Sequence, residues 1–174
     1  MGEPVVGEPS AGGSAVIETE RLALRPLTPG QADAVVAGDR DGQPWAEGYP
    51  RGDDQDVARM FLGRPGGEPW FGPLQIVDRA TGLVVGGIGF FGPPGDDGTV
   101  EFGYGVAKET EGRGYATEAV RALLRFAFDS GRVRRAVADT THENAGSQRV
   151  LEKAGLRHVR SDERLRYYET DTAG

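Results

Sequence analysis

Cysteine is absent from this chain of 174 residues, and histidine occurs only twice. The missing cysteines exclude disulfide bonds, thiolate catalysis and cysteine-ligated metals. Two histidines without an H-E-x-x-H pattern also argue against a catalytic zinc site, so we expect no metal. A chain without cysteine is compatible with a reducing compartment, and we expect a cytoplasmic location.

Long apolar runs and an excess of positive charge are missing as well. No window of the sequence approaches the roughly 18 consecutive apolar residues that a membrane-spanning helix needs. The net charge is −7, which argues against nucleic acid as a partner, because proteins that bind it are usually basic. Long-range attraction mildly favours cationic partners instead.

Glycine and proline, by contrast, are frequent, with 28 and 11 copies. Part of this excess lies in residues 1–15, which have neither the basic start nor the apolar stretch of a signal peptide. We therefore predict a disordered N-terminal tail over residues 1–15. Residues 16–174 are long enough to close a core, and we predict a single domain there.

Segments with strand and helix patterns alternate along this domain. Residues 16–27 alternate in polarity, which is typical of a strand, whereas residues 115–129 repeat apolar side chains at the spacing of a helix. Thr28 is the predicted N-cap of the first helix, and Asp53 or Asp54 that of the second. The predicted helices cover 28–38, 55–64, 115–129 and 144–154. The predicted strands cover 16–27, 70–78 and 83–92 as a hairpin, 99–108, 134–141, 156–161 and 164–170. This order indicates a mixed α/β fold.

Three small residues, Gly112, Gly114 and Ala116, lead into the helix predicted at 115–129. The first N–H groups of a helix have no partner within it, and together with the helix dipole they attract anions. Small side chains let a phosphate approach these N–H groups closely, so the segment indicates a phosphate-binding loop. A tight turn that uses glycine for its positive φ explains the same residues, and both interpretations stay open at this point.

The common nucleotide-binding motifs do not fit this loop. The Walker pattern G-x-x-x-x-G-K-[ST] is absent, and Thr117 stands where a dinucleotide fingerprint starting at Gly112 needs Gly or Ala. A formal G-x-G-x-x-G occurs at residues 87–92, but two prolines follow it in place of a helix. The loop therefore indicates a phosphate ligand of another kind.

The segment EGRGYATEAVRALLRFAF, with VEFGYGV before it and ENAGSQRVLEKAGL after it, resembles the GNAT superfamily of acyl-CoA-dependent N-acyltransferases. The likeness extends over about residues 16–169 and is greatest to the RimJ/RimL branch, which acetylates ribosomal proteins. It implies a mostly antiparallel mixed sheet flanked by helices, in which a splayed parallel strand pair forms the acyl-CoA cleft. It also implies acetyl-CoA as the donor and coenzyme A as the product.

The family's cofactor loop, [Q/R]-x-x-G-x-[G/A], matches residues 111–116, although Glu111 stands where the family usually has Gln or Arg. In the family the pantetheine arm adds to the preceding strand, here residues 102–106. Gly103 and Gly105 suit a bulge in that strand, although they would also suit a simple bend. The implied cofactor-binding residues are Phe102, Tyr104, Val106, Glu111, Gly112, Arg113, Gly114, Tyr115, Ala116, Thr117, Asn144 and Ser147. We expect the side chains of the two tyrosines to be packing groups.

The resemblance also implies two catalytic residues. Glu101 matches the glutamate thought to act as base in this branch, and Ser147 matches a serine proposed to hydrogen-bond the sulfur of coenzyme A. Many family members carry a tyrosine as general acid where this chain has Leu151. A solvated glutamate on a strand and an ordinary first-turn serine are the alternatives for the two residues, and Asn144 would also suit a helix N-cap.

The resemblance implies that residues 31–63 form the acceptor side, and their aromatic and acidic side chains would suit a cationic amine. Trp45 and Tyr49 look exposed among glycines and prolines. The predicted acceptor-binding residues are Trp45, Glu47, Tyr49 and Glu101.

These residues predict an N-acetyltransferase in which the amine attacks acetyl-CoA directly within a ternary complex. The acceptor would be a protein N-terminal amine or a small-molecule amine such as an antibiotic. A non-catalytic acyl-CoA-binding module is the alternative, followed by a phosphate- or nucleotide-binding protein of another fold. An exposed edge strand expected near the C-terminus would suit a homodimer.

Overall fold

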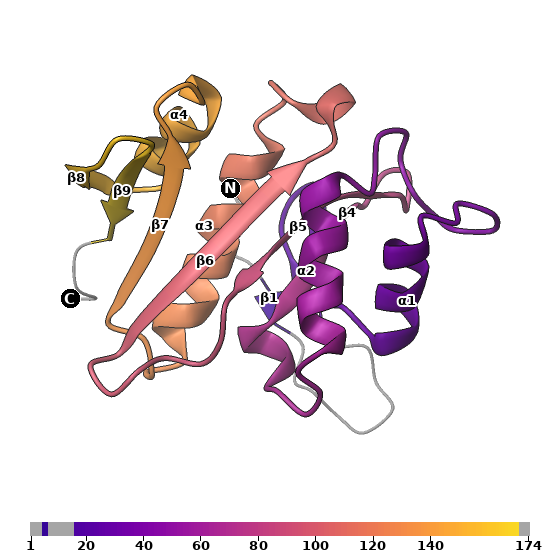
Figure 1. Ribbon diagram of the computed structural model, residues 1–174, viewed down its shortest axis with the longest axis horizontal. Coiled ribbons are helices and arrows are strands. Elements are labelled where there is room, and N and C mark those ends of the chain that lie inside the picture. Colours follow the sequence, from indigo (N-terminus) through magenta and orange to yellow (C-terminus); the bar gives the residue numbers. More distant parts are fainter. Residues whose placement is uncertain (1–4, 7–15, 171–174) are drawn as a thin grey trace.

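Segments of alternating polarity assemble into one mixed sheet (Figure 1). The structure, a computed structural model, describes residues 5–6 and 16–170. Within these residues nine strands follow the order β1-β2-β3-β4-β5-β6-β7-β9-β8. They are β1 (Val5–Val6), β2 (Ile17–Glu18), β3 (Leu22–Pro26), β4 (Pro73–Asp78), β5 (Val84–Phe90), β6 (Thr99–Val106), β7 (Arg135–Thr141), β8 (Arg157–Ser161) and β9 (Leu165–Glu169). Neighbouring strands run antiparallel except β6 and β7, which pair in parallel. The predicted fold class is confirmed.

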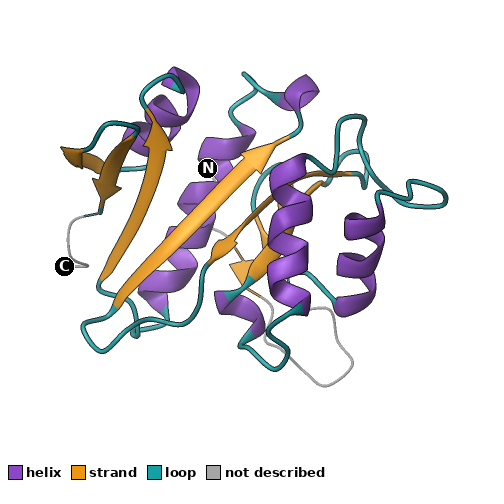
Figure 2. Cartoon of the chain, in the orientation of Figure 1, coloured by secondary structure: helices purple, strands orange, loops and turns teal. Residues whose placement is uncertain are grey.

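Helices cover both faces of this sheet (Figure 2). They are α1 (Pro29–Ala37), α2 (Gly52–Leu62), α3 (Tyr115–Asp129) and α4 (Ala145–Lys153), with short 3₁₀ turns η1 (Pro69–Phe71) and η2 (Lys108–Thr110). The apolar stripe of α3 packs on β6 and its neighbours, where Leu123, Val100 and Phe102 are buried in one core cluster. A second cluster joins α1 and α2 to the opposite face. Burying a side chain such as Leu123 stabilises the fold by about 1.5–3 kcal/mol. No helix among the described residues is long and apolar enough to cross a bilayer.

The start of the domain differs from the prediction. Residues 16–27 form two strands, β2 and β3, because a turn at Thr19 closes between them. The Thr19 backbone N–H donates to the Leu22 carbonyl (2.8 Å), and the Leu22 N–H donates to Thr19 Oγ1 (2.9 Å). Val5–Val6 form strand β1 against β2, whereas the sequence predicts a disordered tail over 1–15. The rest of that tail lies outside the described residues.

Two helix starts test the predicted caps. Thr28 caps α1 as predicted, since its Oγ1 accepts a hydrogen bond from the Gln31 N–H and its own N–H donates to the Gln31 side chain. The prediction for α2 is wrong, because Arg51 is the N-cap. Asp54 lies in the first turn and accepts a hydrogen bond from the Arg51 N–H (2.9 Å). This arrangement fixes Arg51 beside the sheet.

Candidate active site

The parallel pair β6 and β7 separates along its length (Figure 1). Pairing covers Thr99–Glu101 of β6 against Arg135–Val137 of β7 and goes no further. Beyond this point β7 keeps its antiparallel partner β9 as far as Thr141. The predicted splay therefore begins at Glu101, one of the two predicted catalytic residues.

Beyond Glu101, alternate residues of β6 direct their backbone N–H and C=O groups into the space between β6 and β7. The Phe91 N–H donates to the Glu101 carbonyl (2.9 Å), and the Ala107 N–H donates to the Val85 carbonyl (2.7 Å). Backbone groups alternate sides along an antiparallel strand, so odd-numbered residues face β5 and even-numbered residues face the side that β7 leaves. The latter are Phe102, Tyr104 and Val106. They offer N–H and C=O groups at the position where an added strand would bind.

The bulge predicted in β6 is wrong. Pairing between β5 and β6 runs without a register shift from Gly86 and Val106 to Phe90 and Phe102. Close packing by other side chains explains the two glycines instead. A Cβ atom on Gly103 would lie 3.1 Å from the Phe91 ring, and one on Gly105 would clash with the guanidinium of Arg51.

The loop before α3 exposes backbone N–H groups. Gly112 and Gly114 both have φ of +81°, which favours glycine, and α3 has no side-chain N-cap. Among the residues that the structure describes, the N–H groups of residues 112–117 make no hydrogen bond. A Cβ on Gly112 would meet no atom within 4 Å, so the surface there is open. The loop is thus a tight turn that uses glycine for its positive φ, and it also has free N–H groups that suit an anion.

The other predicted loop residues divide into exposed and packed side chains. Glu111 and Arg113 are exposed, whereas Thr117 is buried and Ala116 is half-buried. Tyr115 is also buried, and its hydroxyl donates to Asp78 Oδ2 (3.2 Å), as expected of a packing group. Any contact to a cofactor here would be made chiefly by backbone.

Glu101 lies on the α2 face of the sheet, together with Gly103 and Gly105, while Val100 and Phe102 point into the α3 core. Burial raises the pKa of the Glu101 carboxyl, and the nearby Asp139 carboxylate on β7 raises it further. A carboxylate with a raised pKa is a better proton acceptor near neutral pH than an ordinary glutamate. The predicted position of Glu101 is confirmed, and its role as base stays a prediction.

Ser147 lies on the opposite face, in contact with Tyr104. Asn144 caps α4 by accepting a hydrogen bond from the Ser147 N–H (3.0 Å). The Tyr104 hydroxyl donates to the Ser147 carbonyl (3.1 Å) and lies 2.7 Å from Ser147 Oγ. Burial is the main cause that raises the pKa of Tyr104 to about 12, so the phenol keeps its proton. Tyr104 therefore does more than pack, and the strand alternation that places it opposite Glu101 could have indicated this. Leu151 is fully buried in the core.

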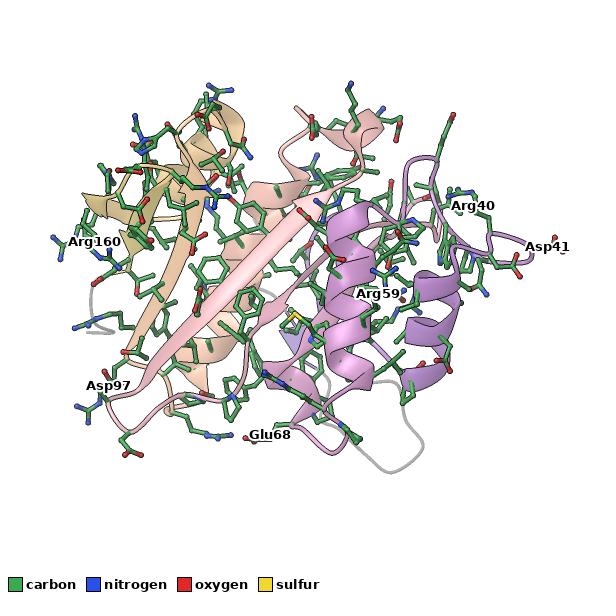
Figure 3. All side chains as sticks on the ribbon, in the orientation of Figure 1. Arg40, Asp41, Arg59, Glu68, Asp97 and Arg160 are labelled. Carbon is green, nitrogen blue, oxygen red and sulfur yellow. The ribbon has the colours of Figure 1, made fainter. Side chains whose placement is uncertain are left out.

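Trp45 and Tyr49 are buried, with 7% and 3% of their surface exposed, so the prediction of exposed rings is wrong. The rings pack edge to face, and the Tyr49 hydroxyl accepts a hydrogen bond from Gln75 Nε2 (3.3 Å). Arg40, in the loop that follows α1 (Figure 3), donates to the carbonyls of Ala46 (2.9 Å) and Tyr49. These aromatic residues shape the loop from within, while Glu47 is exposed.

Arg51 lies in the segment predicted to bind the acceptor, and the sequence did not indicate its position. Its Nε and Nη2 donate to the two carboxylate oxygens of Asp54 (3.1 and 3.0 Å). The guanidinium covers Gly105, and the half-exposed ring of Phe91 covers Gly103. Both side chains lie on the face that carries Glu101.

Comparison with known proteins adds to this geometry. A family model for the GNAT acetyltransferase domain matches residues 21–157. YjdG, an uncharacterised N-acetyltransferase of Bacillus subtilis, is 32% identical over 81% of this chain and 89% of its own length. A structure of a putative GNAT-family acetyltransferase from Bordetella pertussis is 30% identical, covers 89% of this chain and 98% of that one, and has a TM-score of 0.64.

Ribosomal-protein acetyltransferases are among the structural neighbours. A putative ribosomal-protein-serine acetyltransferase from Vibrio cholerae covers 90% of this chain and 97% of its own, with a TM-score of 0.65 and 19% identity. At that identity the likeness shows the fold alone. No group of three or more metal-ligating side chains occurs among the described residues. This chain belongs to the GNAT family of acetyltransferases.

Proposed function

We propose that this protein transfers the acetyl group of acetyl-CoA to an amine by direct attack in a ternary complex, with Glu101 as base and Ser147 as proton donor. One observation carries the proposal. The pairing of β6 with β7 ends at Glu101, so the carboxylate stands where the unpaired backbone groups of β6 begin. An acyl donor bound to that backbone would lie beside a base.

The chain offers two backbone surfaces to the donor. The free N–H groups of the loop at residues 112–117 suit a pyrophosphate. The even-numbered residues of β6 suit the amides of a pantetheine arm, and one of their N–H groups would stabilise negative charge on the thioester oxygen. Acetyl-CoA would supply the electrophilic carbonyl carbon.

Glu101 would accept the proton of the amine. An amine with a pKa near ~10 is mostly protonated at neutral pH, so it must lose a proton before or during attack. The Glu101 carboxylate would take this proton directly or through water. Asp139 adds negative charge beside Glu101, which would attract the ammonium form of the acceptor.

Ser147 would serve the leaving group. As the new N–C bond forms and the C–S bond breaks, the sulfur gains an electron pair and needs a proton. The Ser147 hydroxyl would donate this proton, and the Tyr104 hydroxyl, 2.7 Å from Ser147 Oγ, would turn from the Ser147 carbonyl to restore it. The raised pKa of Tyr104, about 12, keeps the phenol protonated and able to donate.

The acceptor class follows from the α2 face. The carboxylates of Glu101 and Asp139 favour a cationic amine, and the exposed Phe91 ring beside Gly103 offers an apolar contact next to it. Both a protein N-terminal amine and a small-molecule amine meet these requirements. We expect Glu47 to contribute charge at the rim, and Trp45 and Tyr49 to contribute only through the shape of their loop.

A thiol-release assay with acetyl-CoA tests the proposal directly. The panel would contain N-terminal peptides, aminoglycosides, polyamines and amino acids. We expect turnover with at least one cationic amine, and a lower rate at high salt because exposed charges are screened. Binding of acetyl-CoA without turnover of any amine would contradict catalysis and favour a non-catalytic acyl-CoA-binding module.

The predicted homodimer and location belong to the same proposal. All five residues of β8, an edge strand of the described sheet, are exposed. A second copy pairing there would cover them, and light scattering after gel filtration would distinguish monomer from dimer. A cytoplasmic location would match the supply of acetyl-CoA, and fractionation of cells would test it.

A further inference from the structure

Arg21, in the turn between β2 and β3, contacts both sides of the loop before α3. Its Nη1 donates to the carbonyl of Arg113 (2.8 Å), and its Nε donates to Glu118 Oε1 (2.7 Å). Its backbone N–H donates to the other oxygen of Glu118 (2.9 Å), and its guanidinium lies 4.5 Å from the centre of the Tyr115 ring. One side chain thus joins the glycine loop to the first turn of the helix.

The hydrogen bond to the Arg113 carbonyl sets the direction of a neighbouring N–H group. In a planar trans peptide the carbonyl of one residue and the N–H of the next point in opposite directions. Because the Arg113 carbonyl points to Arg21, the N–H of Gly114 points away from Arg21. Gly114 has φ of +81° and an N–H group without a hydrogen bond in the described part of the chain. Arg21 therefore helps to present this N–H to an anion.

The second contact concerns charge. Glu118 places a carboxylate in the first turn of α3, close to where a pyrophosphate would bind. Burial alone would raise the pKa of Glu118, but hydrogen bonds from Thr19 and from the backbone and side chain of Arg21 lower it overall. The carboxylate is therefore ionised at neutral pH and paired with the Arg21 guanidinium at 2.7 Å. Without Arg21, an unpaired negative charge would stand beside the anion-binding loop.

We propose that Arg21 is a positioning residue for the phosphate-binding loop: it orients the Arg113–Gly114 peptide and neutralises Glu118, and so sets the affinity for the pyrophosphate of coenzyme A. This inference rests on the proposed function. Arg21 acts on the ligand through the loop, since its Nη1 donates to the Arg113 carbonyl and its Nε to Glu118. Replacing Arg21 should therefore weaken the binding of acyl donors that carry a pyrophosphate and leave the binding of donors without one unchanged.

The test compares acetyl-CoA with S-acetylpantetheine, which has the same thioester and pantetheine arm but no pyrophosphate. For Arg21→Met we expect the KM for acetyl-CoA to rise about tenfold or more, with kcat within about twofold. The kcat/KM for S-acetylpantetheine should stay within about twofold of the wild-type value. Arg21→Lys should fall between, because lysine restores the charge beside Glu118 but has no planar fork to reach both partners.

Two further variants separate the two contacts. The double variant Arg21→Met/Glu118→Gln removes the unpaired carboxylate, so it should recover part of the affinity for acetyl-CoA. The part of the affinity that is not recovered is then due to the lost orientation of the Arg113–Gly114 peptide. Arg79→Met is the matched control. Arg79 lies on the same surface and donates to the Thr19 carbonyl (2.6 Å), but it pairs with Glu18 and makes no contact with the loop. We expect wild-type kinetics with both donors for Arg79→Met.

Equal losses with both donors in Arg21→Met would indicate general damage and overturn the proposal, as would an unchanged KM for acetyl-CoA. Calorimetric binding of coenzyme A and of pantetheine gives an independent readout. If the wild-type protein turned over no amine, the proposed catalysis would fail, while a tenfold weaker binding of coenzyme A by Arg21→Met would still support the positioning role. Melting temperatures of both arginine variants show whether each is folded.

Discussion

The two sides of the β6–β7 separation are built from different chemistry. The proposed donor side uses backbone, namely the N–H groups of residues 112–117 and the even-numbered residues of β6. The proposed acceptor side uses side chains, namely Glu101, Phe91 and the Arg51–Asp54 pair, which lies over β5 and β6 where glycines leave room. A backbone site needs only small residues in the right order, whereas a side-chain site needs distant segments to meet. The donor side should therefore tolerate most side-chain changes, and the acceptor side should not.

Glu101→Gln should have the largest effect, because it removes the proposed base at the junction of the two sides. Loss of a general base typically costs about 10²- to 10⁴-fold in rate, and we expect kcat to fall by at least about 10²-fold. The KM for acetyl-CoA should stay near the wild-type value, since the donor is bound elsewhere. Steady-state kinetics check this, with Glu152→Gln, an exposed glutamate of α4, as control. An unchanged kcat would assign the base to another group.

Ser147→Ala tests a side chain of the proposed donor side. We expect kcat/KM with acetyl-CoA to fall about tenfold, the value of one hydrogen bond of about 1.4 kcal/mol. The deficit should disappear with acetylated 4-nitrothiophenol, whose thiolate leaves without a proton. Tyr104→Phe should follow the same pattern with a smaller loss. An equal deficit with both thioesters would mean that Ser147 matters for structure and not for the leaving group.

The different chemistry of the two sides also explains what the sequence could predict. Gly112 and Gly114 are adjacent to their helix, so their use is visible locally, and all four predicted helices form. The turn at Thr19 was missed because it contains no glycine or proline. Arg21 and Glu118 are 97 positions apart, and only the fold brings them together. Trp45 and Tyr49 were predicted to be exposed from the glycines and prolines around them, but packing between their rings buries both.

Asp54→Asn should lower the stability of the protein at the proposed acceptor side without changing the affinity for coenzyme A. The Asp54 side chain is only 7% exposed and accepts hydrogen bonds from the Arg51 backbone and guanidinium. Replacing one oxygen by an amide leaves Arg51 without a full partner, and we expect a loss of about 1–3 kcal/mol in the free energy of unfolding. Urea denaturation measures this loss. The affinity for coenzyme A, measured by calorimetry, should be unchanged, and a change would show that the two sides are coupled.

Asp139→Asn should change the pH dependence of the reaction, and it also removes a charge that would attract a cationic acceptor. As the proposed base, Glu101 would be active when deprotonated, so the rate would fall as the pH drops through its pKa. Burial and the charge of Asp139 both raise this pKa. Removing the Asp139 charge lowers it, and the acidic limb of the kcat/KM profile should move to lower pH. A limb that stays in place would mean that Glu101 is not the group that titrates.

Glu111→Gln should have the smallest effect, and it tests whether the loop before α3 binds the pyrophosphate. Glu111 is an exposed carboxylate at the start of a loop that otherwise presents N–H groups to an anion. Because surface charges near a helix N-terminus are worth about 0.3–1 kcal/mol at low ionic strength, its removal should tighten the binding of coenzyme A by about two- to fivefold. The gain should shrink as salt is added. Glu109→Gln is the matched control, since the Glu109 carboxylate packs against Gly48 on the acceptor side. If both variants tightened binding equally, long-range charge alone would be responsible. A gain confined to Glu111→Gln would locate the pyrophosphate at the loop, on the side of the molecule that binds with its backbone.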